Sequence, residues 1–269
     1  MAVSEVFLTA LGSGSKGNAF VIECGDEAII VDQGFCHREL VGRMKTLALL
    51  PEKLCGALLT HDHIDHCRGS RLFCDTFSLP FYTTAKTGAY LKRLGRLPEK
   101  SCFFEVGREF AVGNFSIRSF ATSHDAIEPV GFVISCGGVK IGIATDLGRA
   151  AENVLRELEN CDALVLESNY DKEMLMNSGR PLALKRRICG MRGHLGNRDA
   201  AALLPALLSA KTQLLLLAHV SSECNDRELI RECCDGVLQE IELPELEYAI
   251  LSQDEPSARF AIKCGEVMI

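Results

Sequence analysis

The chain has 269 residues, of which 47% are hydrophobic and 24% charged, and its formal net charge at pH 7 is −7. A chain of this size can bury a core of its own, and its acidic balance provides no global positive field for nonspecific nucleic-acid binding. No stretch approaches the ~20 consecutive apolar residues of a membrane span, and the first residues lack the regions of a secretory signal. We therefore expect a globular cytoplasmic protein without a membrane partner.

In the first half of the chain, short β-rich runs separated by Gly-rich turns alternate with helical runs. The periodicity predicts strands at 6–11, 19–23, 28–31, 55–60 and 81–83. It predicts helices at 37–49, 65–79 and 85–94.

The second half repeats this order of strands followed by helices. It predicts strands at 115–120, 130–135, 139–144, 163–167, 214–218 and 247–251. It predicts helices at 149–158, 182–191, 197–208 and 226–240. The turn Cys136-Gly137-Gly138 joins two of these strands. Two β-then-α halves favour an α+β architecture of two packed sheets with helices outside.

The thirteen cysteines are scattered and form no C-x-x-C pair. We interpret them as reduced and mostly buried thiols, the pattern of a cytoplasmic protein. Cys67 directly follows a histidine of the candidate site described next. Its two interpretations are a redox-sensitive thiol and a residue on the buried face of a helix.

The most informative run is His61-Asp62-His63-Ile64-Asp65-His66, which directly follows a predicted strand. Residues two apart on an extended segment project to the same side, so His61 and His63 can ligate one ion. Asp65 and His66 enter the next helix and suit a second ion. Imidazole and carboxylate together fit Zn²⁺, Mn²⁺ or Fe²⁺. The alternative is a solvated loop with Asp65 as a helix N-cap, but the complete spacing favours a metal site.

Three further ligand-type residues each follow a predicted apolar strand: His124, Asp146 and His219. Such strand ends can converge on one edge of a packed sheet. Any one of these residues alone would be an ordinary loop residue. Together with the histidine run they favour a larger metal site.

The chain resembles metallo-β-lactamase-fold hydrolases over essentially its whole length, and within them the YycJ (WalJ) group, a compact relative of ribonuclease Z. The closer match rests on the runs 12–18 (GSGSKGN), 31–34 (VDQG), 60–66, 123–129 (SHDAIEP), 167–169 (ESN) and 193–197 (GHLGN). The resemblance implies a single domain over residues 1–269. Its fold would be an αββα sandwich, in which two mixed β-sheets pack face to face with helices outside.

The resemblance also implies a dinuclear site. The first ion would be bound by His61, His63 and His124, and the second by Asp65, His66 and His219, with Asp146 bridging the two. Ions ~3.5–4 Å apart can hold a bridging hydroxide that attacks phosphorus, and Asp65 would also act catalytically by orienting it. Asp32 is expected to support the metal loop by hydrogen bonds, with a plain turn residue as the alternative. The metal stays open between Zn²⁺ and Mn²⁺, with Fe²⁺ as a further option.

Glu167 and His194 resemble a ribonuclease Z pair in which the histidine contacts the scissile phosphate and the glutamate orients it. A carboxylate-paired imidazole can supply the proton that a leaving alkoxide needs. The alternative places His194 merely at the flank of the following helix. The expected substrate-binding residues are Ser123, Asp125, Asn169 and Arg192, with Lys185-Arg186-Arg187 as a local positive surface.

Three functional hypotheses follow. The leading one is a phosphodiesterase on nucleic acid, DNA rather than RNA, acting by resemblance as a 5′-to-3′ exonuclease. The second is a small-molecule hydrolase, either a thioesterase or a cyclic-nucleotide phosphodiesterase. The third is a non-enzymatic regulatory partner, against which the complete ligand set argues.

Overall fold

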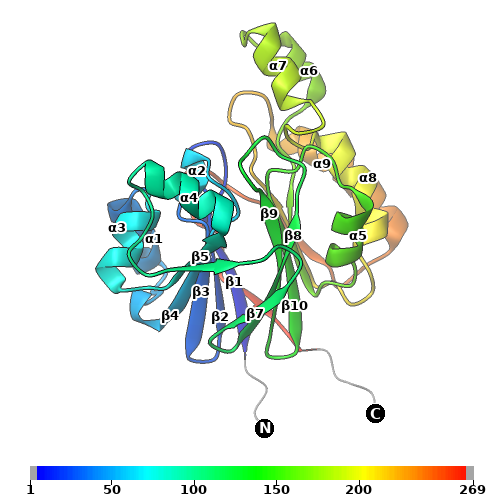
Figure 1. Ribbon diagram of the computed structural model, residues 1–269. Helices are drawn as coiled ribbons and strands as arrows, with labels where there is room; N and C mark the ends of the chain where they lie inside the picture. Colours follow the sequence, from blue (N-terminus) through cyan, green and yellow to red (C-terminus); the bar gives the residue numbers. More distant parts are fainter. Residues whose placement is uncertain (1–4, 265–269) are drawn as a thin grey trace.

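Two seven-stranded sheets pack face to face in the computed structural model, which describes residues 5–264 (Figure 1). The first sheet has the strand order β14-β1-β2-β3-β4-β5-β6, and the second has the order β13-β12-β11-β10-β9-β8-β7. Each sheet contains both antiparallel and parallel pairs. This arrangement, with helices on the outer faces, confirms the expected αββα sandwich.

The first sheet is built from the N-terminal half of the chain and one C-terminal strand. Its strands are β1 (Val6–Gly12), β2 (Ala19–Cys24), β3 (Glu27–Val31), β4 (Leu54–Leu58), β5 (Phe81–Thr84), β6 (Ser101–Phe104) and β14 (Phe260–Ile262). The helices of this half are α1 (His37–Thr46), α2 (Ile64–Cys67), α3 (Ser70–Phe77) and α4 (Ala85–Arg93), with a 3₁₀ turn η1 at Pro51–Lys53. Strand β14 pairs antiparallel with β1, so the C-terminal end of the described chain completes this sheet.

The second sheet follows in chain order. Its strands are β7 (Glu109–Val112), β8 (Phe115–Ala121), β9 (Val130–Cys136), β10 (Val139–Ala144), β11 (Ala163–Glu167), β12 (Leu214–Ala218) and β13 (Glu247–Ile250). Its helices are α5 (Glu152–Leu158), α6 (Lys172–Asn177), α7 (Leu182–Ile188), α8 (Asn197–Leu207) and α9 (Arg227–Ile241). Gly137 and Gly138 have φ of 55° and 78°, which lets them form the tight turn between β9 and β10.

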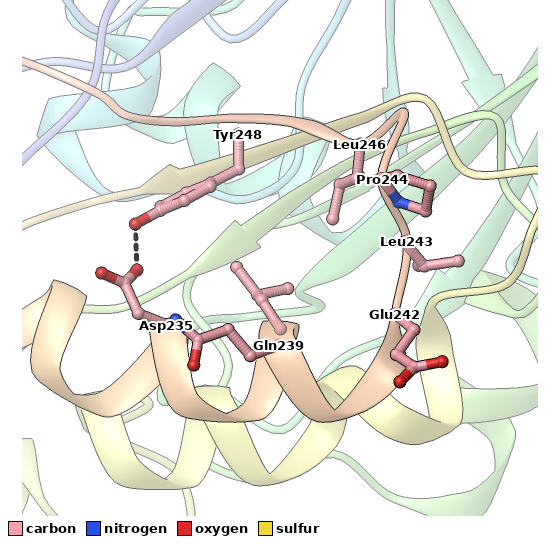
Figure 2. A pocket seen from close by; sticks show the side chains of 8 residues that line it. Asp235, Gln239, Glu242, Leu243, Pro244, Leu246 and Tyr248 are labelled. Atoms are coloured by element: carbon pink, nitrogen blue, oxygen red, sulfur yellow. Dashed lines mark hydrogen bonds between the residues drawn. The ribbon is translucent and has the colours of Figure 1, made fainter.

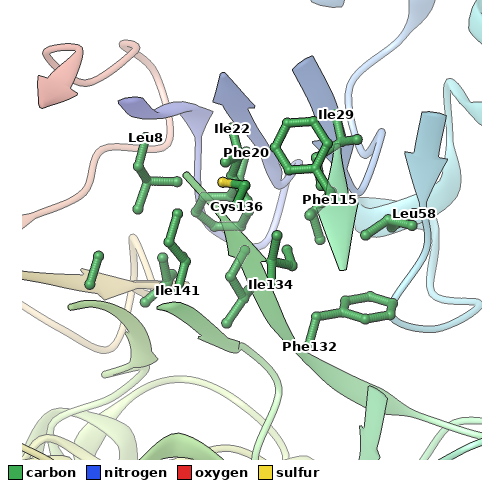
Figure 3. Close-up of a cluster of buried hydrophobic side chains, with 14 of the residues drawn as sticks. Leu8, Phe20, Ile22, Ile29, Leu58, Phe115, Phe132, Ile134, Cys136 and Ile141 are labelled. Carbon is green, nitrogen blue, oxygen red and sulfur yellow. The ribbon is translucent and has the colours of Figure 1, made fainter. Parts of the chain in front are cut away.

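Three apolar layers hold the sandwich together. Between the sheets lie large buried side chains, including Phe20, Phe115 and Phe132 (Figure 3). A second layer packs α1 and α3 against the first sheet, and a third packs α8 and α9 against the second. Parallel strands covered on both faces are apolar throughout, and all five residues of β12 are buried. This packing fixes the strand ends, and therefore the loops that leave them.

The predicted helix at 65–79 was wrong as a single element, because the chain divides it into α2 and α3 around Gly69. The Gly69 N–H donates to the Gln33 carbonyl at 2.8 Å, and a Cβ at this position would lie 2.3 Å from the Phe35 carbonyl oxygen. The tight approach of the 33–35 loop to residue 69 therefore requires glycine and ends the first helical turn. Sequence patterns also missed β6, β7, β14 and α6, which are short and lack a clear apolar period.

No described helix is long and apolar enough to cross a membrane. Within the described residues no disulfide forms, and seven of the thirteen cysteines are buried. Cys67 lies on the buried face of α2, where its thiol donates to the Asp62 carbonyl at 3.3 Å. Burial raises the pKa of this thiol to about 11, so it stays neutral and unreactive beside the histidine run.

Candidate metal centre

The candidate ligands lie where strands end at one edge of the sandwich. His61 follows β4, His124 follows β8, Asp146 follows β10, and His219 directly follows β12. The sheets hold these strand ends in register, so residues far apart in sequence meet in one place. The structure brings together all seven ligand-type residues that the sequence singled out.

One group of donors consists of His61, His63 and His124, each with a ring nitrogen within 4.8 Å of the others. His63 Nδ1 lies 3.1 Å from His124 Nε2. His61 Nε2 is buried and has no hydrogen-bond partner among the described residues. A buried nitrogen without a partner is costly, and a divalent cation would supply the missing one. These residues therefore fit a metal ion.

A second group consists of Asp65, His66 and His219, whose donor atoms also lie within 4.8 Å of one another. His219 Nε2 lies 3.2 Å from Asp65 Oδ2, and His66 Nε2 lies 3.6 Å from the same oxygen. This group supplies mixed nitrogen and oxygen donors, as Zn²⁺, Mn²⁺ and Fe²⁺ prefer.

Asp146 lies between the two groups and contacts both. Its Oδ2 is 3.0 Å from His66 Nε2, and its Oδ1 is 3.6 Å from both His124 Nε2 and His219 Nε2. The carboxylate is almost fully buried. A single anion shared by two donor groups is suited to join two cations.

Left-handed backbone places several of these side chains. Asp32, Asp146 and His219 have φ of 60°, 57° and 54°, a region that residues other than glycine occupy only at a cost. Each is found directly or shortly after the last residue of a strand: β3, β10 or β12. These strained residues come from both sheets and meet at one edge of the sandwich, which points to a functional site there.

Glu167 and His194 form a second feature beside the ligands. Glu167 Oε1 lies 2.7 Å from His194 Nδ1, and its Oε2 accepts hydrogen bonds from the backbone N–H of Leu147 and Leu195. His194 Nδ1 is also 3.5 Å from Asp146 Oδ1. Glu167 is fully buried, whereas the His194 ring is 20% exposed. The His194 ring is thus fixed on one side by the buried Glu167 and exposed to solvent on the other.

A cavity of about 220 Å³ opens at this place and is lined by His63, Asp65, Asp146, His194 and His219, among others. A larger cavity of about 620 Å³ lies between α9 and the segment leading into β13, where Tyr248 is hydrogen bonded to Asp235 (Figure 2). None of the metal-ligand candidates lines that larger cavity. The chemistry therefore belongs to the smaller one.

Comparison with known proteins identifies the family of the chain. The family model of the β-lactamase superfamily domain matches residues 27–220. The exodeoxyribonuclease YycJ of Bacillus anthracis is 32% identical over 86% of this chain and 89% of its own length. The chain belongs to the β-lactamase superfamily, in its YycJ/WalJ-like group. It is a metal-dependent hydrolase, as the histidine run predicted.

Two solved structures share the fold of this superfamily member. The metallo-β-lactamase fold protein YhfI from Bacillus subtilis is 17% identical with a TM-score of 0.71, covering 96% of this chain and 99% of its own. The short form of human tRNase Z is 18% identical with a TM-score of 0.61, covering 80% of this chain and 93% of its own. The expected kinship with ribonuclease Z is thereby confirmed at the level of fold.

The electrostatics of this β-lactamase superfamily site divide its histidines into two kinds. Burial lowers the pKa of His61 and of His124, so both rings are neutral. Burial would also lower the pKa of His66 and His219, but nearby carboxylates together outweigh it: Asp146 with Asp32 and Asp65 around His66, and Asp146 with Asp65 and Glu167 around His219. The pKa of His66 is raised well above its ordinary value, and that of His219 is raised to about 10. Without metal, these two rings hold protons against the carboxylates.

Metal loading is therefore expected to release protons. A ring nitrogen must be deprotonated to ligate a metal, and the raised pKa values mean that His66 and His219 carry protons near neutral pH. Titrating chelator-treated protein with Zn²⁺ by calorimetry, in buffers of different ionisation enthalpy, should show release of roughly one to two protons per chain. The His219→Ala variant should release about one fewer. A heat of binding independent of the buffer would contradict this electrostatic picture.

Supporting residues surround the ligands. Asp32 accepts a hydrogen bond from the Thr60 N–H at 2.8 Å and pairs with His66 Nδ1 at 2.7 Å, the kind of contact expected of it. Sequence reasoning gave Asn18 no role, although it lies in the GSGSKGN run. Its Nδ2 is 3.1 Å from His66 Nε2, and its Oδ1 accepts from the Ser13 hydroxyl, which in turn accepts from the His219 N–H. The run thus links two candidate ligands, His66 and His219.

The four residues expected to bind substrate fall into two groups. Ser123 Oγ donates to the Met191 carbonyl, Arg192 donates to the His124 carbonyl, and Asn169 Nδ2 donates to the His219 carbonyl. These three bind the protein's own backbone beside the site. Asp125 instead lines the cavity. Contacts of all four with substrate remain predictions.

Proposed function

We propose that this chain is a dinuclear metal-dependent nuclease that hydrolyses phosphodiester bonds in DNA. The observation that carries this proposal is the His194–Glu167 pair, which lies 3.5 Å from Asp146 in the middle of the ligand groups. Many hydrolyses need only the metal ligands. An anchored imidazole directed at the same point suits a reaction whose leaving group must be protonated.

We assign His61, His63 and His124 to one ion, Asp65, His66 and His219 to the other, and Asp146 to both. When bound, such ions supply a water activated at neutral pH and positive charge to balance the phosphate oxygens. Asp65 lies at the cavity with its Oδ2 near two histidines, a position from which it can orient a nucleophile. Zn²⁺ and Mn²⁺ both suit the donors, and Fe²⁺ is a further option.

His194 would protonate the leaving oxygen. Burial lowers the pKa of its ring, but the Glu167 carboxylate, together with Asp146, raises the pKa above its ordinary value, which favours the protonated ring near neutral pH. Two backbone N–H groups fix Glu167, which in turn fixes the orientation of the ring. Nδ1 faces Glu167, so Nε2 is the nitrogen left to meet the substrate.

The relative named exodeoxyribonuclease YycJ supports DNA as the substrate, and 5′-to-3′ digestion is carried over from the family resemblance. Two arginines at the cavity, Arg180 and Arg187, favour an anionic substrate despite the net charge of −7. A thioester or cyclic nucleotide would also meet the same metal ligands. The arginines and the proton donor favour the phosphodiester over the thioester.

The test is hydrolysis by purified protein loaded with Mn²⁺ or Zn²⁺. We expect cleavage of labelled single- or double-stranded DNA, with mononucleotides released from the 5′ end, and slower action on RNA and thioesters. Elemental analysis should give two metal ions per chain. Absence of DNA cleavage by fully loaded protein would refute the nuclease, and faster thioester hydrolysis would establish the small-molecule alternative.

A further inference from the structure

The cavity beside the metal ligands has a wall that the proposed catalytic residues do not form. The segment containing α6 and α7 contributes Arg180, Leu184, Arg187 and Ile188 to its lining. Figure 1 shows α6 and α7 projecting beyond the ends of the second sheet. A guanidinium group carries a positive charge and only donors, so neither arginine can ligate a metal ion. Their place at the cavity therefore needs a separate explanation.

Helix α7 turns one face toward the cavity. Leu184, Arg187 and Ile188 stand at positions i, i+3 and i+4, which lie on the same side of a helix. Of the expected positive run Lys185-Arg186-Arg187, only Arg187 lines the cavity, whereas Arg186 is exposed and lies outside it. The wall thus combines one guanidinium with two apolar side chains, a combination that suits a phosphate attached to a nucleoside.

Arg187 is held where it can reach an anion. Its Nε donates to Asp125 Oδ2 at 2.5 Å, and its side chain is 59% exposed. Its Nη atoms donate no hydrogen bond to any residue in the described part of the chain. Water screens an ion pair this exposed, so the guanidinium can turn to another anion at little cost. Its planar N–H groups match two phosphate oxygens.

Arg180 completes the wall. Its Nη2 lies 2.9 Å from Glu223 Oε2, and the Glu223 side chain is 67% exposed. Each arginine therefore already pairs with a carboxylate: Arg187 with Asp125, which lines the cavity, and Arg180 with Glu223, which does not. The remaining cavity carboxylates, Asp65 and Asp146, belong to the metal-ligand groups. A phosphate entering along α7 would meet guanidinium groups rather than unpaired carboxylates.

We propose that Arg187, with Arg180 beside it, binds the substrate phosphate next to the phosphodiester that is cleaved. Leu184 and Ile188 contact the sugar or base of the same nucleotide. The proposal rests on the proposed nuclease function and names part of its substrate site. The ligand is a nucleic-acid phosphate, either the 5′-terminal monophosphate or an internal phosphodiester.

Arg187→Gln tests the subsite, and Arg186→Gln is its matched control because it removes the same charge one residue away. With the full-length, metal-loaded chain, KM for a labelled DNA oligonucleotide should rise about tenfold in Arg187→Gln, since a charge-assisted contact is lost. It should stay unchanged in Arg186→Gln. The kcat should change less than KM. Metal content should equal that of the wild type, because Arg187 contacts no ligand directly.

A binding measurement separates phosphate contact from a structural role. Anisotropy of a fluorescein-labelled, phosphorothioate-linked single strand gives log Kobs against log salt concentration. The slope should become less steep by about 0.7 for each arginine replaced, first in Arg187→Gln and again in the Arg180→Gln/Arg187→Gln double variant. A residue that only supports the fold does not change the number of counterions released.

The two sources of phosphate are distinguished by the 5′ end. If KM rises in Arg187→Gln only for 5′-phosphorylated DNA, Arg187 binds the terminal monophosphate. If KM rises equally for 5′-hydroxyl DNA, Arg187 binds an internal phosphodiester. The proposed subsite is wrong if Arg187→Gln has the same KM, and the same slope of log Kobs against log salt concentration, as Arg186→Gln. If the wild-type chain cleaves no DNA but the salt dependence of DNA binding is still less steep in Arg187→Gln, the proposed nuclease function is wrong and the phosphate subsite stands.

Discussion

Replacement of Asp146 by alanine is expected to abolish hydrolysis and to lower the metal content of the purified protein. Its two carboxylate oxygens lie within 3.6 Å of histidines from both donor groups, and it is buried. Its loss removes the anion that balances both ions. Changes to residues that only support metal ligands typically cost 10–100-fold in affinity or activity, and we expect the loss here to exceed about 100-fold. Elemental analysis and the rate on DNA measure the two effects.

Asp162→Ala is the matched control for this variant. Asp162 is a similarly buried carboxylate, but it precedes β11 at the opposite end of the strand, where its Oδ2 accepts the Lys140 N–H at 2.7 Å. Its replacement should lower the free energy of unfolding and leave metal content and rate per folded molecule unchanged. If the Asp146 variant kept both its metal and its rate, the ligand assignment would be wrong.

Replacement of His194 by alanine is expected to lower kcat on DNA by about 10²–10⁴-fold without loss of metal, because a general acid typically contributes this much. His194 lies in one donor group with Asp146, Glu167 and His219, but Asp146 and His219 also belong to groups without it, and its Nδ1 pairs with Glu167 at 2.7 Å. The decisive substrate is a p-nitrophenyl ester of thymidine phosphate. Its leaving group departs without a proton, so the rate on this ester should fall far less than the rate on DNA.

Two variants control this experiment. Glu167→Gln keeps the shape of the partner but removes its charge, and it should reproduce part of the loss on DNA. His37→Ala removes an imidazole that packs near Phe73 and Phe77, away from the ligands, and it should change neither rate. An equal loss on DNA and on the p-nitrophenyl ester would show that His194 does not act as a proton donor.

Much of the fold could be predicted from the sequence because most helices and strands show a clear pattern of apolar residues. The strands β11 and β12 are continuous apolar runs, and both occupy the predicted residues 163–167 and 214–218. The elements that were missed, such as β6 and α6, are short. Strand β6 forms because β5 pairs with it, which local sequence does not show. Helix α6 has a local N-cap, since the Asp171 side chain accepts from the Met174 N–H, but it is too short to show an apolar period. The break at Gly69 likewise depends on a backbone approach from residues 33–35.

For the site, the sequence alone indicated which residue types carry chemistry. The spacing of His61, His63, Asp65 and His66 indicated metal ligands without any coordinates. It could not show that Asp146 lies between the two donor groups, because that distance depends on how the two sheets pack. It also could not separate Arg186 from Arg187, which are adjacent and chemically identical. Only the orientation of α7 decides that Arg187 faces the cavity and Arg186 does not, since helix packing sets which side of the turn meets the site.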